Sequence, residues 1–254
     1  MTTAAKLPKA LGKTPLLEAI FEVRFRPTIP SAGDVLPGLL FADFRTEYTI
    51  VEQLPAGAVP REIRESNPNL VHQPTHRLTA PKAGSTLQVG DRMASVTLLY
   101  PYPGWGKFRE RVVSLLKSVK RTGLVAECER FAFRYVNVIT APKDGPRLPM
   151  LTVQFGWPGH PITERGLHLR FERDEGEFVT IFQISPDVTG KVGDATVSGL
   201  LIDIDTIRPK VPATLWDPDV KLLEDAHSFA KQTFYALLTD ATLRGLEPIY
   251  EDPV

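Results

Sequence analysis

Hydrophobic and polar residues alternate with a period of two near the start of the chain. The apolar positions are Leu17, Ala19, Phe21, Val23 and Phe25, and the positions between them carry Glu18, Ile20, Glu22, Arg24 and Arg26. Successive side chains of a β-strand point to opposite faces, so this pattern predicts a strand with one face on the core and the other in water. The same alternation over residues 128–140 predicts a second strand of this kind, with Arg130 and Arg134 on its polar side.

Apolar residues three or four positions apart predict helices over residues 31–44, 105–121 and 218–238. We expect Asp217 to cap the last of these helices, with Pro218 at its first position. Thr239 can cap a further short helix that ends at Gly245.

Shorter apolar or alternating runs predict the remaining strands, over residues 48–53, 77–80, 85–89, 92–99, 151–155, 166–173, 177–185 and 196–207. Gly90 and Asp91 suit a tight hairpin turn between two of them. Residues 54–73 are polar and contain proline, and we expect a connection there that is too long to be a tight turn.

The predicted order is β-α-β-β-β-β-α over residues 16–121 and β-β-β-β-β-α over residues 126–238. We therefore expect an α+β fold built from two β-α-β4-α halves of helix-grip or TATA-binding-protein-like type, with curved antiparallel sheets packed on long helices. The expected division is a tail over residues 1–14, a first repeat over 15–123, and a second repeat with C-terminal helices over 124–254. A shared fold does not fix a function.

The composition is that of a globular protein, with 254 residues, 43% hydrophobic and 24% charged. The formal net charge of zero argues against a surface that binds nucleic acid or anionic membrane everywhere. The single cysteine, Cys128, excludes an internal disulfide framework and a cysteine-built zinc site. No apolar run has the length of a signal peptide or a membrane span, so we expect a cytoplasmic protein.

Catalytic and cofactor motifs are incomplete in this sequence. It has no nucleophile elbow and no dinucleotide-binding glycine loop, and the segment at Gly190 lacks most of a phosphate-binding loop. His72 and His76 flank a proline, and we expect them in a solvated loop. Asp203 and Asp205 share one face of a strand and could hold a divalent cation, although a solvent-exposed acidic edge is the simpler expectation. We predict no catalytic residue, no metal and no cofactor.

Candidate binding residues lie on the charged faces of the two long alternating strands: Glu22, Arg24, Arg130 and Arg134. Charges of both signs on paired strands can form cross-strand ion pairs, or they can line a groove in which arginines bind carboxylate, phosphate or peptide groups.

Two further candidates are polar or large residues at apolar positions. Asn137 lies on the aromatic face, where a buried amide must be hydrogen-bonded, and we expect it to hold a neighbouring loop. Trp105 is expected to anchor its helix on the sheet, with a ligand platform as the alternative.

Several segments resemble a family of uncharacterised, sporadically distributed bacterial and archaeal proteins. They are PLLEAIFEVRF from Pro15, YPYPGW from Tyr100, FRYVN from Phe133, and the helix over residues 227–243. The resemblance spans nearly the whole chain. It implies a prokaryotic cytoplasmic protein linked to mobile-element or defence gene neighbourhoods, and it supplies no catalytic residue.

Three functions follow as hypotheses. The first is a non-enzymatic binding or accessory protein whose curved-sheet platform engages a protein partner or a second copy of itself. The second is a small-ligand-binding protein or enzyme with a pocket between the sheet and a long helix. The third is nucleic-acid binding through the basic helix over residues 107–121.

Overall fold

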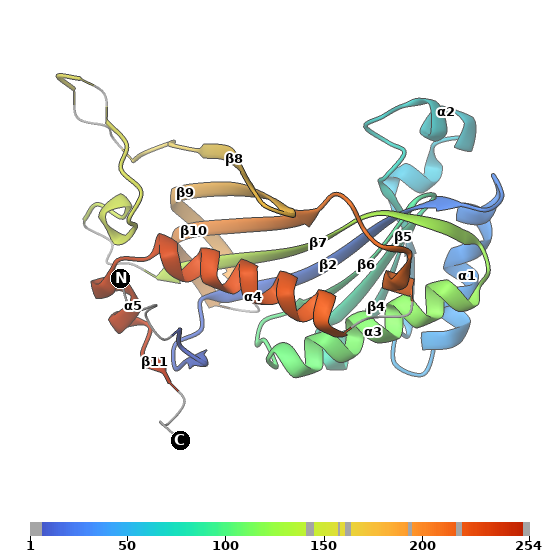
Figure 1. Cartoon of the computed structure of the whole chain (residues 1–254), viewed down its shortest axis with the longest axis horizontal. Coiled ribbons are helices and arrows are strands. Elements are labelled where there is room, and N and C mark those ends of the chain that lie inside the picture. Colours follow the sequence, from blue (N-terminus) through green and yellow to red (C-terminus); the bar gives the residue numbers. More distant parts are fainter. Residues whose placement is uncertain are drawn as a thin grey trace.

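A single antiparallel sheet organises the molecule (Figure 1). The computed structural model describes residues 7–140, 145–156, 158–160, 164–192, 195–216 and 220–250. Within them the large sheet has nine strands in the order β3-β4-β5-β6-β2-β7-β10-β9-β8. In that order the strands are Ile50–Gln53, Pro74–Ala80, Ser85–Gly90, Met93–Leu99, Leu16–Pro27, Val125–Thr140, Ala195–Arg208, Phe178–Val192 and Leu169–Glu175.

The two long alternating strands predicted from the sequence lie side by side at the centre of the sheet. β2 pairs with β7 in antiparallel fashion, and Phe21 lies opposite Phe133 in this register. β6 flanks the pair on one side and β10 on the other. The two halves of the chain therefore share one continuous sheet.

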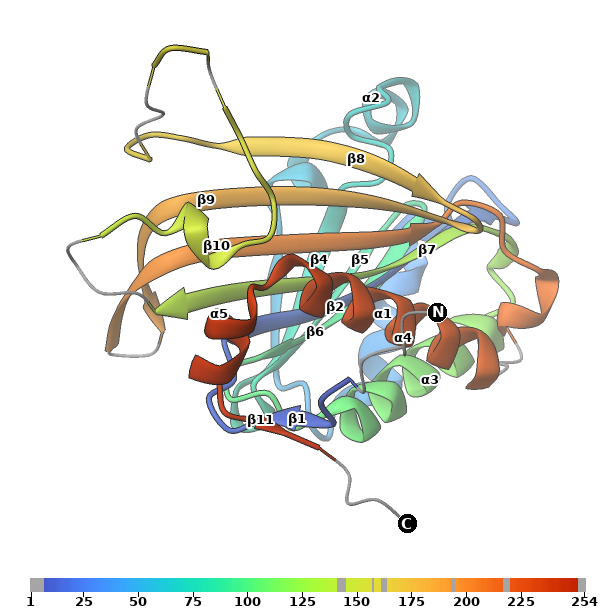
Figure 2. The same cartoon turned by 60° about the vertical axis from the view of Figure 1, so that its left-hand side comes forward.

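Three long helices pack on one face of this sheet, which we call the helix-covered face (Figures 1 and 2). They are α1 (Ala32–Phe44), α3 (Trp105–Arg121) and α4 (Val220–Leu237). The apolar stripe of α3, including Phe108 and Leu115, is fully buried against the aromatic side of β2 and β7. This arrangement confirms the predicted α+β class and the helical positions.

Short elements complete the described chain at its ends. β1 (Ala10–Leu11) pairs with β11 (Pro248–Ile249), which brings together segments near the two ends of the described chain. The short helix α5 (Asp240–Gly245) begins as predicted, because the Thr239 side chain accepts a hydrogen bond from the backbone N–H of Thr242. The predicted cap at Asp217 and Pro218 lies outside the described residues.

The predicted strand over residues 151–155 is wrong. A 3-10 helix (Leu148–Met150) precedes this segment, and only an isolated bridge between Leu151 and Leu238 forms in it. The backbone partners of this segment lie at the end of α4, where the Thr152 N–H donates to the carbonyl oxygen of Leu237, and a helix end offers no strand to pair with.

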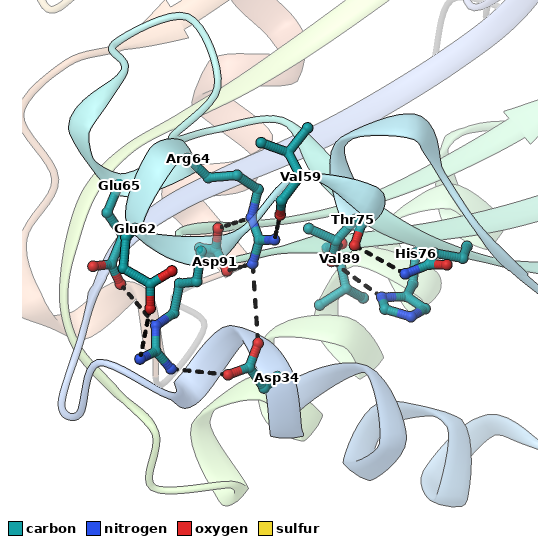
Figure 3. A network of polar contacts seen from close by, with 12 residues as sticks. Asp34, Val59, Glu62, Arg64, Glu65, Thr75, His76, Val89 and Asp91 are labelled. Atoms are coloured by element: carbon teal, nitrogen blue, oxygen red, sulfur yellow. Dashed lines mark hydrogen bonds and ion pairs between the residues drawn. The ribbon is translucent and has the colours of Figure 1, made fainter.

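The long polar connection predicted over residues 54–73 contains short helical elements. The segment holds a 3-10 helix (Pro55–Ala58) and the helix α2 (Arg61–Ser66), and another 3-10 helix (Pro81–Ala83) follows β4. Arg64 of α2 is buried and forms a two-point ion pair with Asp91, with its Nε and Nη2 atoms 2.6 and 2.8 Å from the carboxylate oxygens (Figure 3). Asp91 of the predicted hairpin turn thus fixes α2 on the end of the sheet.

The strand predicted over residues 48–53 begins later, at Ile50. Tyr48 lies before it and is buried, with its hydroxyl 2.7 Å from the Ser85 hydroxyl. Another 3-10 helix (Ala213–Trp216) connects β10 to the segment before α4.

Candidate functional site

The charged side chains predicted on β2 and β7 lie on the sheet face opposite the helices. Arg24 and Arg130 are direct cross-strand neighbours, and like charges in that position repel. Glu22 resolves the repulsion, since its Oε1 atom accepts hydrogen bonds from Arg24 Nε at 2.7 Å and from Arg130 Nη2 at 2.8 Å. The structure therefore brings Glu22, Arg24 and Arg130 together as an ion-paired cluster.

Arg134 joins a second ion pair on the same face. Its Nε and Nη2 atoms lie 2.8 and 2.6 Å from the two carboxylate oxygens of Asp203, and Gln183 also donates to Asp203. Asp203 is buried and lies on an interior strand, so the expectation of an exposed acidic edge is wrong. The predicted arginines thus have carboxylate partners within the chain.

Asp205 stands out among these carboxylates. Its Oδ1 atom is buried and has no hydrogen-bond partner among the described residues. Burial raises the pKa of Asp205 from 3.8 to about 6, against the lowering effect of Arg130. The free energy of unfolding therefore depends on pH through the ionisation of Asp205.

The basic helix α3 also has partners within the chain. Arg109 donates to Glu224 of α4 at 2.7 Å, and Arg111 pairs with Glu47. The first of these pairs links the basic helix to α4 of the second half of the chain.

A pocket of ≈ 710 Å³ lies between the sheet and α4. This volume is within the range of small-molecule binding sites in proteins. The pocket is lined by the N-terminal segment, the corner before α3, strands β7 and β10, and α4. Its aromatic walls are Tyr102, Trp105, Tyr135, Phe234 and Tyr235. The predicted residues Trp105 and Asn137 both line this pocket.

His227 is the central polar residue of the pocket. Its ring stacks on Trp105 with the centroids 3.9 Å apart and the planes at 4°, and its Nδ1 atom lies 2.9 Å from the Tyr135 hydroxyl. Burial lowers the pKa of His227 to about 4, and nearby Lys231 acts in the same direction, so the imidazole is neutral at physiological pH. Glu224 is held by the Trp105 indole N–H at 2.7 Å as well as by Arg109.

Trp105 therefore does more than the predicted anchoring of α3. It packs edge-on against Phe108 and Phe133, as an anchor should, and it also presents its ring to His227 in the pocket. One edge of the Trp105 ring anchors α3, as expected, and one face of the ring is available to the pocket, as in the alternative of a ligand platform.

The sequence suggested that Asn137 holds a neighbouring loop, and this expectation is wrong. Its Nδ2 atom lies 3.3 Å from the carbonyl oxygen of Tyr135 and 3.4 Å from that of Ile202, both within the sheet. The correction follows from the position of Asn137 in the middle of the sheet, where the nearest backbone acceptors belong to its own strand and to β10.

Tyr102 contributes a further polar group that the sequence did not single out. Its hydroxyl is buried and has no hydrogen-bond partner among the described residues, and burial raises its pKa. The proline-rich corner over residues 100–104 places Tyr102 beside the pocket, but no periodic pattern marks that position in the sequence.

Metal binding finds little support in the residues that the structure describes. No group of three or more His, Cys, Asp or Glu side chains that could hold an ion occurs among them. His72 lies 3.6 Å from Glu129, and His76 contacts Thr75, so the two histidines have separate partners.

The fold and the site define an α+β protein with a continuous antiparallel sheet, helices on one face, and an aromatic pocket beneath α4. No protein-family model matches the chain, and no curated protein matches it in sequence. The resemblance to the bacterial and archaeal family stays a prediction. No helix among the described residues is long and apolar enough to cross a membrane.

Proposed function

We propose that this protein is a non-enzymatic binding protein that holds a small molecule in the pocket between the sheet and α4. The observation that carries the proposal is the pocket itself, with a volume of ≈ 710 Å³, aromatic walls and a few polar groups. Binding sites for small molecules in proteins have this combination of size, apolar lining and sparse polar contacts. The charged face is less suited to the task because its arginines are already paired with Glu22 and Asp203.

The strand order supports a further part of the proposal, that the chain arose by duplication of a helix-grip unit. β2 and β7, the first strands of the two halves, are adjacent, and the last strand of each half lies beside its first. The second half contains no counterpart of α1 and β3 among the described residues. In this interpretation the pocket lies where α4 of the second half crosses the paired first strands.

A titration with Nile red, an uncharged dye whose fluorescence increases in apolar surroundings, tests the proposed function. We expect saturable binding with one site per chain. Ala230→Leu enlarges a buried side chain that lines the pocket and should weaken binding about tenfold or more. Ser228→Phe, at an exposed position that also lines the pocket, is a second blocking variant.

Asp225→Leu is the matched control, because Asp225 is exposed on the same helix and does not line the pocket. Melting temperatures establish that each variant is folded. The proposal fails if the wild type shows no saturable binding, or if folded blocking variants bind as the wild type does. Mass spectrometry of molecules released from protein purified from its native source would identify the occupant.

A protein partner on the charged face is the second candidate function. It is favoured by Arg134, whose side chain is 43% exposed although it is paired with Asp203. A guanidinium in this position can form an additional contact with a partner carboxylate. Arg24→Gln and Arg134→Gln should then reduce capture of a partner while the melting temperature changes little, and unchanged capture by both variants would count against this face.

A further inference from the structure

Two polar atoms in the pocket have no hydrogen-bond partner among the described residues. The hydrogen bonds of Asn137 use only its Nδ2 atom, which leaves Oδ1 as a vacant acceptor on a residue that is 4% exposed. The hydrogen bond of His227 uses only Nδ1, which leaves Nε2. Both residues line the pocket and neither atom is fully buried, so both atoms are open to a ligand there.

The orientation of the Asn137 amide follows from its neighbours. The oxygen and nitrogen of an amide are assigned from the surrounding hydrogen bonds. Both atoms near Nδ2 are backbone carbonyl oxygens, of Tyr135 and Ile202, and these can only accept. The amide nitrogen must therefore face them, and Asn137 offers its oxygen, an acceptor, to the pocket.

The proton on His227 follows from the same reasoning. A neutral imidazole has one N–H donor and one acceptor nitrogen. If Nδ1 carried the proton, the Tyr135 hydroxyl would accept it and its own hydrogen would have no acceptor among the described residues. The arrangement in which Tyr135 donates to Nδ1 satisfies both groups, and it leaves the proton on Nε2 as a donor.

Asn137, Tyr135 and His227 all line the pocket. Asn137 and Tyr135 are two residues apart on β7 and face the same side, so they are separated by about 7 Å along the strand. His227 is bonded to Tyr135, and its ring and Trp105 form a flat aromatic wall. The nearest charged groups are engaged, since Glu224 binds Trp105 and Arg109, and Lys231 donates to the backbone carbonyl of Lys9.

We propose that the pocket binds an uncharged, flat heterocycle of the lactam type, an inference that rests on the proposed function. Its ring N–H would donate to Asn137 Oδ1, and its carbonyl oxygen would accept from His227 Nε2. The rings would lie among the aromatic side chains that line the pocket.

Displacement of Nile red by three related probes tests this inference. Carbostyril is a two-ring lactam with both polar groups, N-methylcarbostyril lacks the N–H, and naphthalene lacks both. We expect the wild type to bind carbostyril about tenfold more tightly than N-methylcarbostyril, because a buried acceptor left unpaired costs affinity. Asn137→Leu should bring the two affinities together.

His227→Phe keeps an aromatic ring against Trp105 and removes the donor at Nε2. It should weaken binding of both lactams about tenfold while naphthalene binding changes little. Asp225→Leu serves again as the control, with no change for any probe. Melting temperatures accompany each variant.

The outcomes separate the two proposals. If Nile red binds but carbostyril fails to bind, or binds no better than N-methylcarbostyril, the lactam inference is overturned and the proposed pocket function stands. If Asn137→Leu is folded and keeps the wild-type preference, Asn137 is not the acceptor and the inference is again overturned. If Nile red does not bind the wild type, the proposed function itself fails.

Discussion

Replacement of the buried carboxyl group of Asp205 should stabilise the protein at neutral pH. In the folded chain the pKa of Asp205 rises from 3.8 to about 6, with burial as the largest cause. A group whose pKa is raised on folding holds its proton more tightly in the native state. The contribution of Asp205 to the free energy of unfolding is therefore most favourable below about pH 4. This contribution becomes less favourable as the pH rises to about 6.

The magnitude follows from the size of this change. One pKa unit corresponds to about 1.36 kcal/mol, so the ionised Asp205 carboxylate costs about 3 kcal/mol at pH 7. Asparagine has nearly the same shape and cannot ionise. We expect Asp205→Asn to raise the free energy of unfolding at pH 7.5 by up to about 3 kcal/mol, and to leave it nearly unchanged at pH 4.

His227 acts with the opposite sign in nearly the same range. Its pKa falls to about 4 in the folded protein through burial, so acid favours the unfolded chain between about pH 6.5 and pH 4. The two groups therefore oppose each other in the wild type. Asp205→Asn should make stability fall more steeply on acidification, and His72, whose pKa is also lowered by burial, adds to that slope.

Urea denaturation of the wild type and variants across pH 4.5 to 8 measures these effects. Asp203→Asn is the matched control: it removes a carboxylate that Arg134 and Gln183 both bind, and we expect it to destabilise by about 1 to 3 kcal/mol at pH 7.5. The reasoning about Asp205 is refuted if Asp205→Asn destabilises the protein at pH 7.5, or if its effect does not change with pH.

Three further predictions concern the core, the buried ion pair and the cysteine. Phe108→Ala and Leu115→Ala should each destabilise by about 2 to 5 kcal/mol in chemical denaturation because both side chains are fully buried, and a loss under about 1 kcal/mol would remove α3 from the core. Arg64→Met leaves Asp91 buried without its partner and should cost about 3 kcal/mol or more, part of which Asp91→Asn should recover in the double variant. Burial raises the pKa of Cys128 to about 12, so iodoacetamide at pH 8 should leave the native protein unmodified, and rapid alkylation would contradict that burial.

The faces of the central strands could be predicted because a period of two has a direct geometric meaning. Phe21 and Phe133 belong to the core, and Glu22 and Arg130 belong to the opposite face, as the alternation of each strand requires. The partners of the charges could not be predicted. Arg134 lies directly across from Asp205 yet bonds to Asp203, a choice that depends on side-chain reach and not on register.

The helix α2 escaped prediction because its main stabilising contact is distant in sequence. Arg64 lies in a polar segment, which indicates a solvated loop when it is considered alone. Its burial depends on Asp91, in the turn between β5 and β6. A polar residue that is buried by a distant partner has no signal in local periodicity.

The pocket, in turn, lies at the boundary between two parts of the core. One cluster of buried residues contains Leu223 and Ala226 of α4, and the other contains Leu237 at the end of the same helix. Between them the helix carries His227 and Ala230 toward the pocket. The spacing of apolar residues in α4 predicts one continuous buried face. It does not indicate that a pocket interrupts this face.

Ala230, a small side chain on α4, lies at this interruption of the buried face. Ala230 is buried and lines the pocket, where a larger residue would extend the packing of α4 on the sheet. Unfilled space in a core lowers stability, in proportion to its volume. If the space served only packing, Ala230→Leu would be expected to stabilise the protein with no other effect. A folded variant that gains stability and loses Nile red binding would show instead that this space is the one that admits the dye.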